Sequence, residues 1–254
     1  MPFSGSREAL LKIKAKRPAR PPGGALFFLH ASAPRSPRRF FTAGFSLLEM
    51  LVTAALVAVL AAAVHAALSG AARRADRTDA LSKMRAMGSA VLRYSSDHQG
   101  RLPPLFPGQV LEYEEGRGGR LVTECADYLG IEKLPGRHLV SRLMPRAYRS
   151  LKDPSSHAAM RVYVMNSSIA SGSATVSPFG RVVTAGQPPV GPSPLVAVAG
   201  AFPSLWMMSN ADRMHPAVAS APWQASAPTA PPLGDVRAVF RFDGSAGLEN
   251  ILEP

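Results

Sequence analysis

One carboxylate, Glu49, begins a charge-free apolar stretch of the sequence. It lies five residues after Gly44 and four after Phe45, and the 19 residues from Met50 to Leu68 are apolar except for one threonine and one histidine. An ionised carboxylate in hydrocarbon is costly unless a cation pairs with it or it reaches the membrane interface. The spacing therefore favours an ion pair at Glu49 within a helical assembly. The alternative is an ordinary signal anchor in which Glu49 lies at the membrane interface.

Catalytic and metal-binding patterns are weak in this sequence. We find no G-x-S-x-G, H-E-x-x-H, P-loop or Rossmann fingerprint. The six histidines are scattered, and none is spaced as a metal ligand with Cys or another His. Asp97 and His98 are adjacent where a helix should end, and we expect them to cap or solvate it. We expect neither enzymatic activity nor a cofactor.

Two smaller features allow alternatives. Asp235, Asp243 and Glu249 could suggest a C-terminal calcium site, but the acids are sparse and no tight D-x-D-x-D/N loop is present, so Asp243 is expected to be a turn residue. Cys125, the one cysteine, permits no internal disulfide. A buried thiol is the commoner state, with a free or intermolecularly paired thiol as the alternative.

The apolar stretch has the length and flanks of a membrane-spanning helix. At about 1.5 Å per residue, 19 residues cover roughly the 30 Å core of a bilayer. Residues 1–44 carry nine Lys and Arg against Glu8 alone, so +8 of the chain's net +12 lies in this segment. The basic flank predicts a cytoplasmic N-terminus and places everything after the helix outside. Because the remainder is only weakly basic, nucleic-acid binding is not expected.

The junction resembles a known processing signature. Residues 44–49 read GFSLLE and precede the apolar helix. This is similar to the cleavage and methylation signature of type IV prepilins and type II secretion pseudopilins, which has a Gly, a Phe or Met, and Glu at the fifth mature position. The resemblance implies cleavage after Gly44 by a prepilin peptidase and N-methylation of Phe45. Glu49 would then be the fifth mature residue and would pair with the new amine of a neighbouring subunit.

The resemblance also implies a fold, partners and a location. We expect a pilin-like α+β protein with a long N-terminal helix packed on a small antiparallel head. Its partners would be the prepilin peptidase, other pilin or pseudopilin subunits, an inner-membrane assembly platform and the lipid bilayer. The protein would be a single-pass protein of the inner membrane, with its head outside the cytoplasm, and would assemble into a pseudopilus or pilus-like filament.

The domain boundaries follow from composition. Residues 1–44 form a basic leader, which is long for this family and is either genuine or the result of a start codon assigned too early. Residues 45–70 form the membrane or filament-core helix, and residues 71–100 its amphipathic continuation, ending near Gly100 and Pro103. Leu81, Met84, Gly88, Val91 and Leu92 mark one face of this half, which we expect to contact the head. Gly88 is unfavourable in a helix interior by about 1 kcal/mol.

Residues 101–254 should form the α+β head. We expect a short helix at 121–129 and strands at 161–165, 195–199 and 235–242, the last followed by an Asp243-Gly244 turn and a short returning strand through Leu248. A Pro- and Ala-rich segment, about 216–233, is expected to be an exposed loop.

Three short elements are similar to ones in exported prepilin-like proteins of Planctomycetes and Verrucomicrobia. They are YSSDHQGRLPP from Tyr94, YVMN from Tyr163, and VFRFDG from Val239. Ser245 replaces the His of that group's C-terminal element.

Two other functions remain open from the sequence. The first is a signal-anchored extracytoplasmic protein whose head binds a polymer or partner without polymerising. The second is a membrane-tethered hydrolase using His98 or His215, against which the absence of a catalytic motif argues.

Overall fold

The computed structural model describes residues 46–149, 151 and 159–251. The chain divides after Leu51 into two compact units. Of the first, the structure describes Ser46–Leu51, where the long helix α1 (Leu47–Asp97) begins. The second unit contains the rest of α1 and the head.

Helix α1 changes character along its length. Its side chains from Val52 to Ala75 are exposed apart from the half-buried Gly70, whereas a stripe at helical spacing from Ala80 to Ser95 is buried. Met84, Gly88 and Val91 lie in this stripe, which confirms the expected contact between the amphipathic half and the head. The buried face is rotated from the predicted one, because Met87 is buried while Leu81 and Leu92 are only partly covered.

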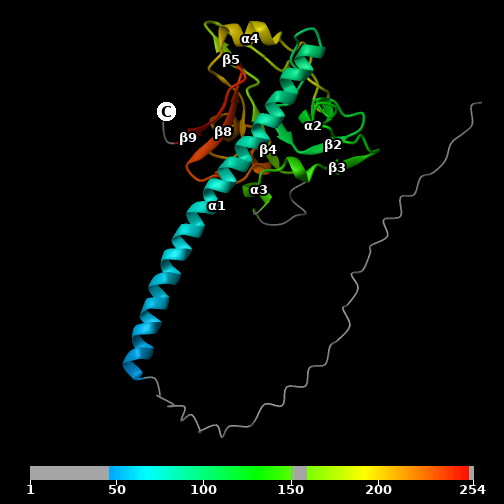
Figure 1. Ribbon diagram of the computed structural model, residues 1–254. Coiled ribbons are helices and arrows are strands. Elements are labelled where there is room, and N and C mark those ends of the chain that lie inside the picture. The colour runs from blue at the N-terminus through cyan, green and yellow to red at the C-terminus, as the bar shows by residue number, and fades with distance from the viewer. Residues whose placement is uncertain (1–45, 150, 152–158, 252–254) are drawn as a thin grey trace, which may run out of the picture. The chain divides into compact units, whose positions relative to one another are not determined.

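A five-stranded antiparallel sheet supports this half of the helix (Figure 1). Its order is β1 (Gly108–Val110), β4 (Arg161–Met165), β7 (Trp206–Asn210), β8 (Val236–Arg241) and β9 (Ala246–Asn250). The α+β arrangement of one long N-terminal helix and an antiparallel sheet is therefore as expected. The strand predictions at 161–165 and 235–242 are confirmed, as is the returning strand after Asp243-Gly244.

Shorter elements complete the described part of the head. Two hairpins pair β2 (Glu112–Glu114) with β3 (Arg137–Leu139) and β5 (Ile169–Ser171) with β6 (Ala174–Val176). The short helices are α2 (Leu121–Glu124), η1 (Ser141–Leu143), α3 (Arg146–Arg149), α4 (Leu195–Ala201), α5 (Pro216–Ala219) and η3 (Gln224–Ser226).

Helix α1 packs tightly against the sheet at Gly88. A Cβ built there would lie 2.4 Å from ring atoms of Phe240 on β8. Phe240 belongs to the main core and Gly88 is buried, so the Phe240 ring occupies the space that any larger side chain at position 88 would need. Close packing explains why a residue unfavourable in a helix interior stands at this position.

Three predictions about the head are wrong. Residues 195–199 form the start of α4 instead of a strand, and only Val198 of this helix is buried. The run is short, and alanine favours a helix once no strand neighbour is available. The helix expected at 121–129 ends at Glu124 and continues as turns. The segment 216–233 is not simply exposed, because Val218 and Ala227 are buried beside Trp206 and Trp223.

The sequence also gave no indication of β7, the central strand of the sheet. Met207 to Asn210 are all buried, so this strand shows no alternation of polar and apolar residues. At the end of α1, Gln99 and Gly100 both have positive φ, and the Gly100 N–H donates to the Ser95 carbonyl at 2.8 Å. The predicted glycine stop at Gly100 is therefore shared with Gln99.

Candidate functional site

The first turn of α1 forms a reciprocal cap. The Glu49 N–H donates to the Ser46 Oγ at 3.1 Å, and the Ser46 N–H donates to the Glu49 Oε2 at 3.2 Å. This is the capping-box arrangement, which satisfies two N–H groups that a helix start leaves unpaired. The S-x-x-E spacing of Ser46 and Glu49 is a sequence signal of this cap, although the predicted roles of Glu49 were ion pairing in an assembly or a place at the membrane interface.

The position of Glu49 also suits its charge. The N-terminus of a helix carries about half a positive charge, which favours a carboxylate there. A carboxylate has about four acceptor sites and can accept several donors at once. Gly44 and Phe45, the expected cleavage and methylation residues, lie outside the described residues.

The apolar part of α1 is exposed to a degree unusual for a folded protein. Its side chains include Leu56, Leu60 and Leu68, which are 59%, 63% and 63% exposed. A stretch of 18 residues in this helix has a mean hydropathy of 2.5 and no buried residue. A contiguous apolar surface of this size marks contact with a membrane or with another protein. Within residues 46–149, 151 and 159–251, α1 is the one helix long and apolar enough to span a membrane, which fits a single-pass anchor.

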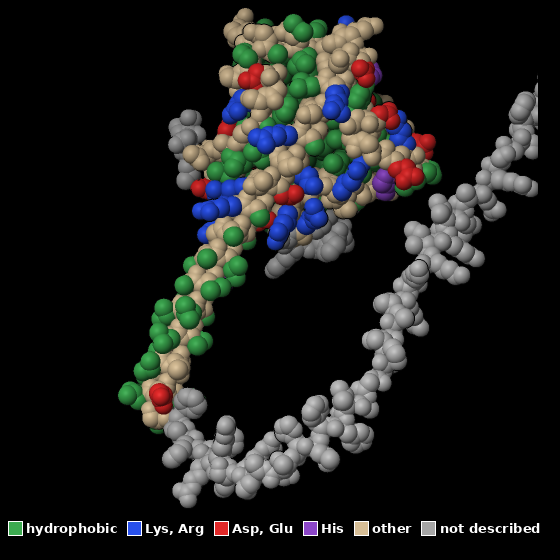
Figure 2. Space-filling view, viewed as in Figure 1, with side chains coloured by type: hydrophobic (Ala, Val, Ile, Leu, Met, Phe, Trp, Pro, Cys, Tyr) green, Lys and Arg blue, Asp and Glu red, His purple; other side chains and the backbone are tan. Residues whose placement is uncertain are grey.

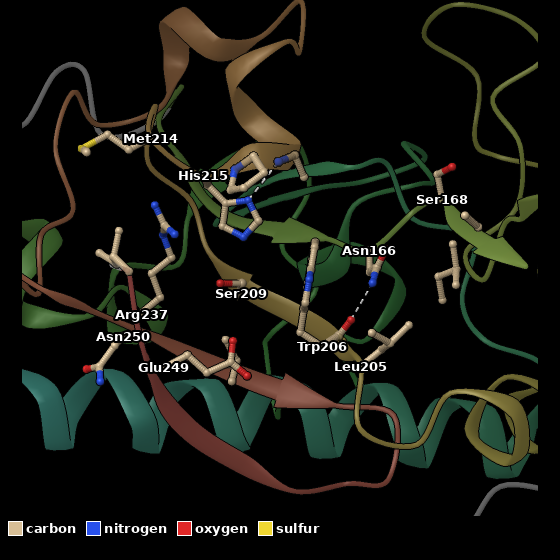
Figure 3. A pocket seen from close by; sticks show the side chains of 16 residues that line it. Asn166, Ser168, Leu205, Trp206, Ser209, Met214, His215, Arg237, Glu249 and Asn250 are labelled. Atoms are coloured by element: carbon tan, nitrogen blue, oxygen red, sulfur yellow. Dashed lines mark hydrogen bonds between the residues drawn. The ribbon is translucent and has the colours of Figure 1, made fainter. Parts of the chain in front are cut away.

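A cavity of about 630 Å³ in the head is the second candidate site. It is lined by Trp206 and Ser209 from β7, by His215 before α5, and by Arg237 and Glu249 from β8 and β9 (Figure 3). From the sequence, His215 was a candidate only for the alternative function of a hydrolase. No signal along the chain predicted that these residues come together, because their strands are distant in sequence.

The ionisable groups of this cavity are engaged with protein partners. The buried Asp212 carboxylate accepts two bonds from Arg237, at 2.7 and 2.9 Å. The His215 Nδ1 accepts the Ala217 N–H at 3.2 Å and so caps α5. Burial, followed by the Arg237 charge, lowers the pKa of His215 to about 4. Glu249 pairs with Arg241 at 2.6 Å. The cavity thus offers a neutral imidazole beside an indole, which suits binding better than proton transfer at neutral pH.

The helix-end pair Asp97 and His98 does not form a dyad. The Asp97 carboxylate accepts the Tyr128 hydroxyl at 2.9 Å, while His98 stacks on Tyr94 with its Nδ1 2.8 Å from the Tyr94 carbonyl. Each group is held by a different neighbour. The expectation that these residues finish and solvate the helix end fits this geometry.

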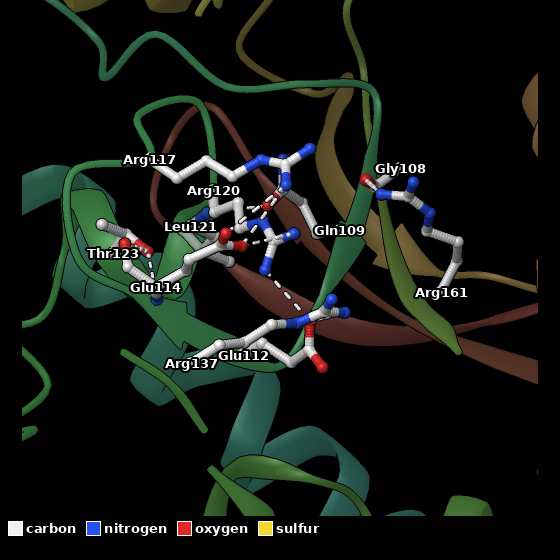
Figure 4. A network of polar contacts seen from close by, with 10 residues as sticks. All are labelled: Gly108, Gln109, Glu112, Glu114, Arg117, Arg120, Leu121, Thr123, Arg137 and Arg161. Atoms are coloured by element: carbon white, nitrogen blue, oxygen red, sulfur yellow. Dashed lines mark hydrogen bonds and ion pairs between the residues drawn. The ribbon is translucent and has the colours of Figure 1, made fainter. Parts of the chain in front are cut away.

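A network of arginines and carboxylates joins β2 to the loops beside it (Figure 4). The Glu112 side chain is 2% exposed and accepts Arg120 at 3.0 Å and the Arg137 Nε at 2.8 Å. Glu114 pairs with Arg120 at 3.0 Å. Since the carboxylates face arginines of this chain, the network ties β2 to Arg137 of β3 and to Arg120, which precedes α2.

The remaining candidate residues, Asp235, Asp243 and Cys125, are engaged in contacts within the protein. Asp235 pairs with Arg77, and the Asp243 carboxylate accepts the Ser245 N–H at 2.8 Å, as a turn aspartate does. In the described part of the chain, no group of three or more His, Cys, Asp or Glu residues is placed to hold a metal ion. Cys125 is fully buried, as the commoner alternative predicted, and burial raises the pKa of its thiol.

Comparisons with protein-family models, with curated proteins and with solved structures find no match for this chain.

Proposed function

We propose that the chain is a prepilin-like structural subunit that is cleaved after Gly44 and assembles through its N-terminal helix. The observation that carries the proposal is the division of α1 into two halves. An exposed apolar half begins with a capped carboxylate, and the other half is buried against the head. One helix can thus lie in a membrane before assembly and among other helices afterwards, while the head stays folded in both states.

The role proposed for Glu49 is to set the stagger between subunits. Cleavage would create an amine at Phe45 on each subunit. In an apolar helix bundle, the amine of one subunit would pair with the Glu49 carboxylate of its neighbour. Loss of one partner from a buried ion pair costs about 3–5 kcal/mol, which corresponds to a loss of more than about 100-fold in association.

The variant Glu49→Gln tests this role. Glutamine serves in a capping box as glutamate does, so this change removes the charge while keeping the cap. Glu115→Gln is the control, since Glu115 is an exposed carboxylate of the head. In cells with a working assembly system, we expect Glu49→Gln protein to reach the membrane but to be absent from sheared filaments. Equal filament incorporation of both variants would contradict the proposal.

A specific observation favours a second function. The cavity beside His215 falls within the usual size range of small-ligand pockets, about 300–1,000 Å³. It is the feature that a signal-anchored, non-polymerising binding protein would use. In that case Glu49→Gln would be harmless, whereas Trp206→Ala would abolish retention of the ligand on the head.

A further inference from the structure

Basic side chains gather where the exposed half of α1 meets the head (Figure 2). Arg73 is the first charged residue after the apolar run that ends at Leu68. Five residues of helix correspond to about 7.5 Å, while the headgroup region extends roughly 5–8 Å beyond each side of the hydrocarbon core. If the apolar run lies in a bilayer, Arg73 therefore lies among the lipid headgroups on the side of the head.

A cleft of about 670 Å³ opens at this level. One wall is formed by Arg73, Asp76 and Arg77 of α1, and the other by Pro231–Asp235. The apolar side chains of Pro231, Pro232 and Leu233 thus face a charged helix surface. An amphipathic ligand with an anionic group and adjoining apolar chains matches a cleft of this composition.

Two arginines and two aspartates line this cleft, and Arg74 and Arg146 lie next to lining residues. Asp235 pairs with Arg77, and Asp76 lies 3.4 Å from the Arg146 Nε. Arg73 and Arg74 are exposed, and neither has an ion-pair partner among the described residues. The Arg77 Nε and the Asp76 Oδ1 are both buried without a hydrogen-bond partner in the described structure. The two acids thus face Arg77 and Arg146, which leaves Arg73 and Arg74 as surplus positive charge.

We propose that this cleft binds the phosphate of an anionic phospholipid in the leaflet on the side of the head, and so holds the head against the membrane before assembly. The inference rests on the membrane-anchoring part of the proposed function. Arg73 would contact the phosphate, the exposed Arg74 next to it would add positive charge at the same level, and the Pro231–Leu233 wall would contact the upper acyl chains. Guanidinium groups are the preferred partners of phosphate in proteins.

The test uses the full-length chain in nanodiscs that contain equal amounts of phosphatidylglycerol and phosphatidylcholine with identical acyl chains. Native mass spectrometry counts the lipids that stay bound after release. We expect phosphatidylglycerol to exceed phosphatidylcholine by about fivefold or more, the factor that one arginine near an anionic surface supplies. The double variant Arg73→Glu, Arg74→Glu should bring the ratio to one or below, whereas Arg73→Lys, Arg74→Lys should retain a preference.

The control is the double variant Arg93→Glu, Arg101→Glu. It makes the same change in net charge at two exposed residues, Arg93, which lies about 30 Å farther along α1, and Arg101, which follows the end of that helix. Both are well beyond the screening length, so this variant should keep the wild-type ratio. Equal retention of both lipids by the wild-type chain would overturn the lipid site. So would a filament defect of the Arg73, Arg74 glutamate variant without any lipid preference in the wild type, which would indicate a neighbouring subunit as the partner.

Flotation with vesicles after alkaline extraction separates this inference from the proposed function. If the chain floats with the vesicles but shows no lipid preference, only the proposed phosphate site is contradicted. If the chain does not float, both the proposed membrane anchor and the phosphate site that depends on it are contradicted.

Discussion

The packing of α1 on the sheet predicts that Gly88→Ala destabilises the head. The new Cβ would lie 2.4–2.5 Å from three atoms of the Phe240 ring at a buried position. Overpacking a core of this kind costs up to about 3 kcal/mol, while replacing glycine by alanine in a helix recovers about 1 kcal/mol. We therefore expect the free energy of unfolding to fall by about 2 kcal/mol.

The matched control is Gly200→Ala in α4. Gly200 is also helical, but a Cβ there meets no atom within 4 Å. This variant should gain about 0.4–1 kcal/mol in the free energy of unfolding. Urea unfolding of the detergent-solubilised full-length chain, followed by the fluorescence of Trp206 and Trp223, measures both changes.

The two variants should thus move the urea midpoint in opposite directions. Adding Phe240→Leu to Gly88→Ala should cost less than the sum of the two single changes, because the smaller side chain relieves the clash. If Gly88→Ala raised the midpoint as Gly200→Ala does, the close approach of α1 to Phe240 would be refuted.

Three further predictions concern the head. Folding lowers the pKa of His215 from 6.5 to about 4, so as the pH falls the histidine is protonated in the unfolded chain before it is protonated in the folded one. The free energy of unfolding should therefore decline by about 3 kcal/mol between pH 6.5 and 4. His215→Asn should flatten that part of a plot of unfolding free energy against pH. Asp212→Asn should lower the free energy of unfolding by about 3–5 kcal/mol in urea titrations, because it leaves Arg237 without its carboxylate. Cys125 should resist maleimide in the native chain and react once urea unfolds the head; rapid native labelling would contradict its burial.

The sequence predicted those parts of the fold whose patterns are local. Each of three correct predictions depends on residues close together in the sequence. They are the change along α1 from apolar to amphipathic, the alternation of apolar and polar residues in β8, and the Asp243-Gly244 turn. β7 was missed because it is buried on both faces, and Leu195–Ala201 was assigned to a strand because a short apolar run does not distinguish strand from helix.

The candidate sites likewise divide into one that depends on neighbouring residues and two that depend on tertiary contacts. Glu49 was recognised from its place before an apolar run, and its bond with Ser46 lies within one turn of helix. The cavity around His215 and the cleft beside Arg73 each depend on tertiary contacts between segments far apart in the chain. Neither could be predicted from residue spacing.

Mass spectrometry of the N-terminus of the membrane-extracted protein, from cells with an active prepilin peptidase, tests the central claim most directly. The account predicts a mature chain that begins at Phe45 and carries one additional methyl group. An unmethylated chain that begins at Met1 would contradict it and would leave a plain membrane anchor with a separately functioning head.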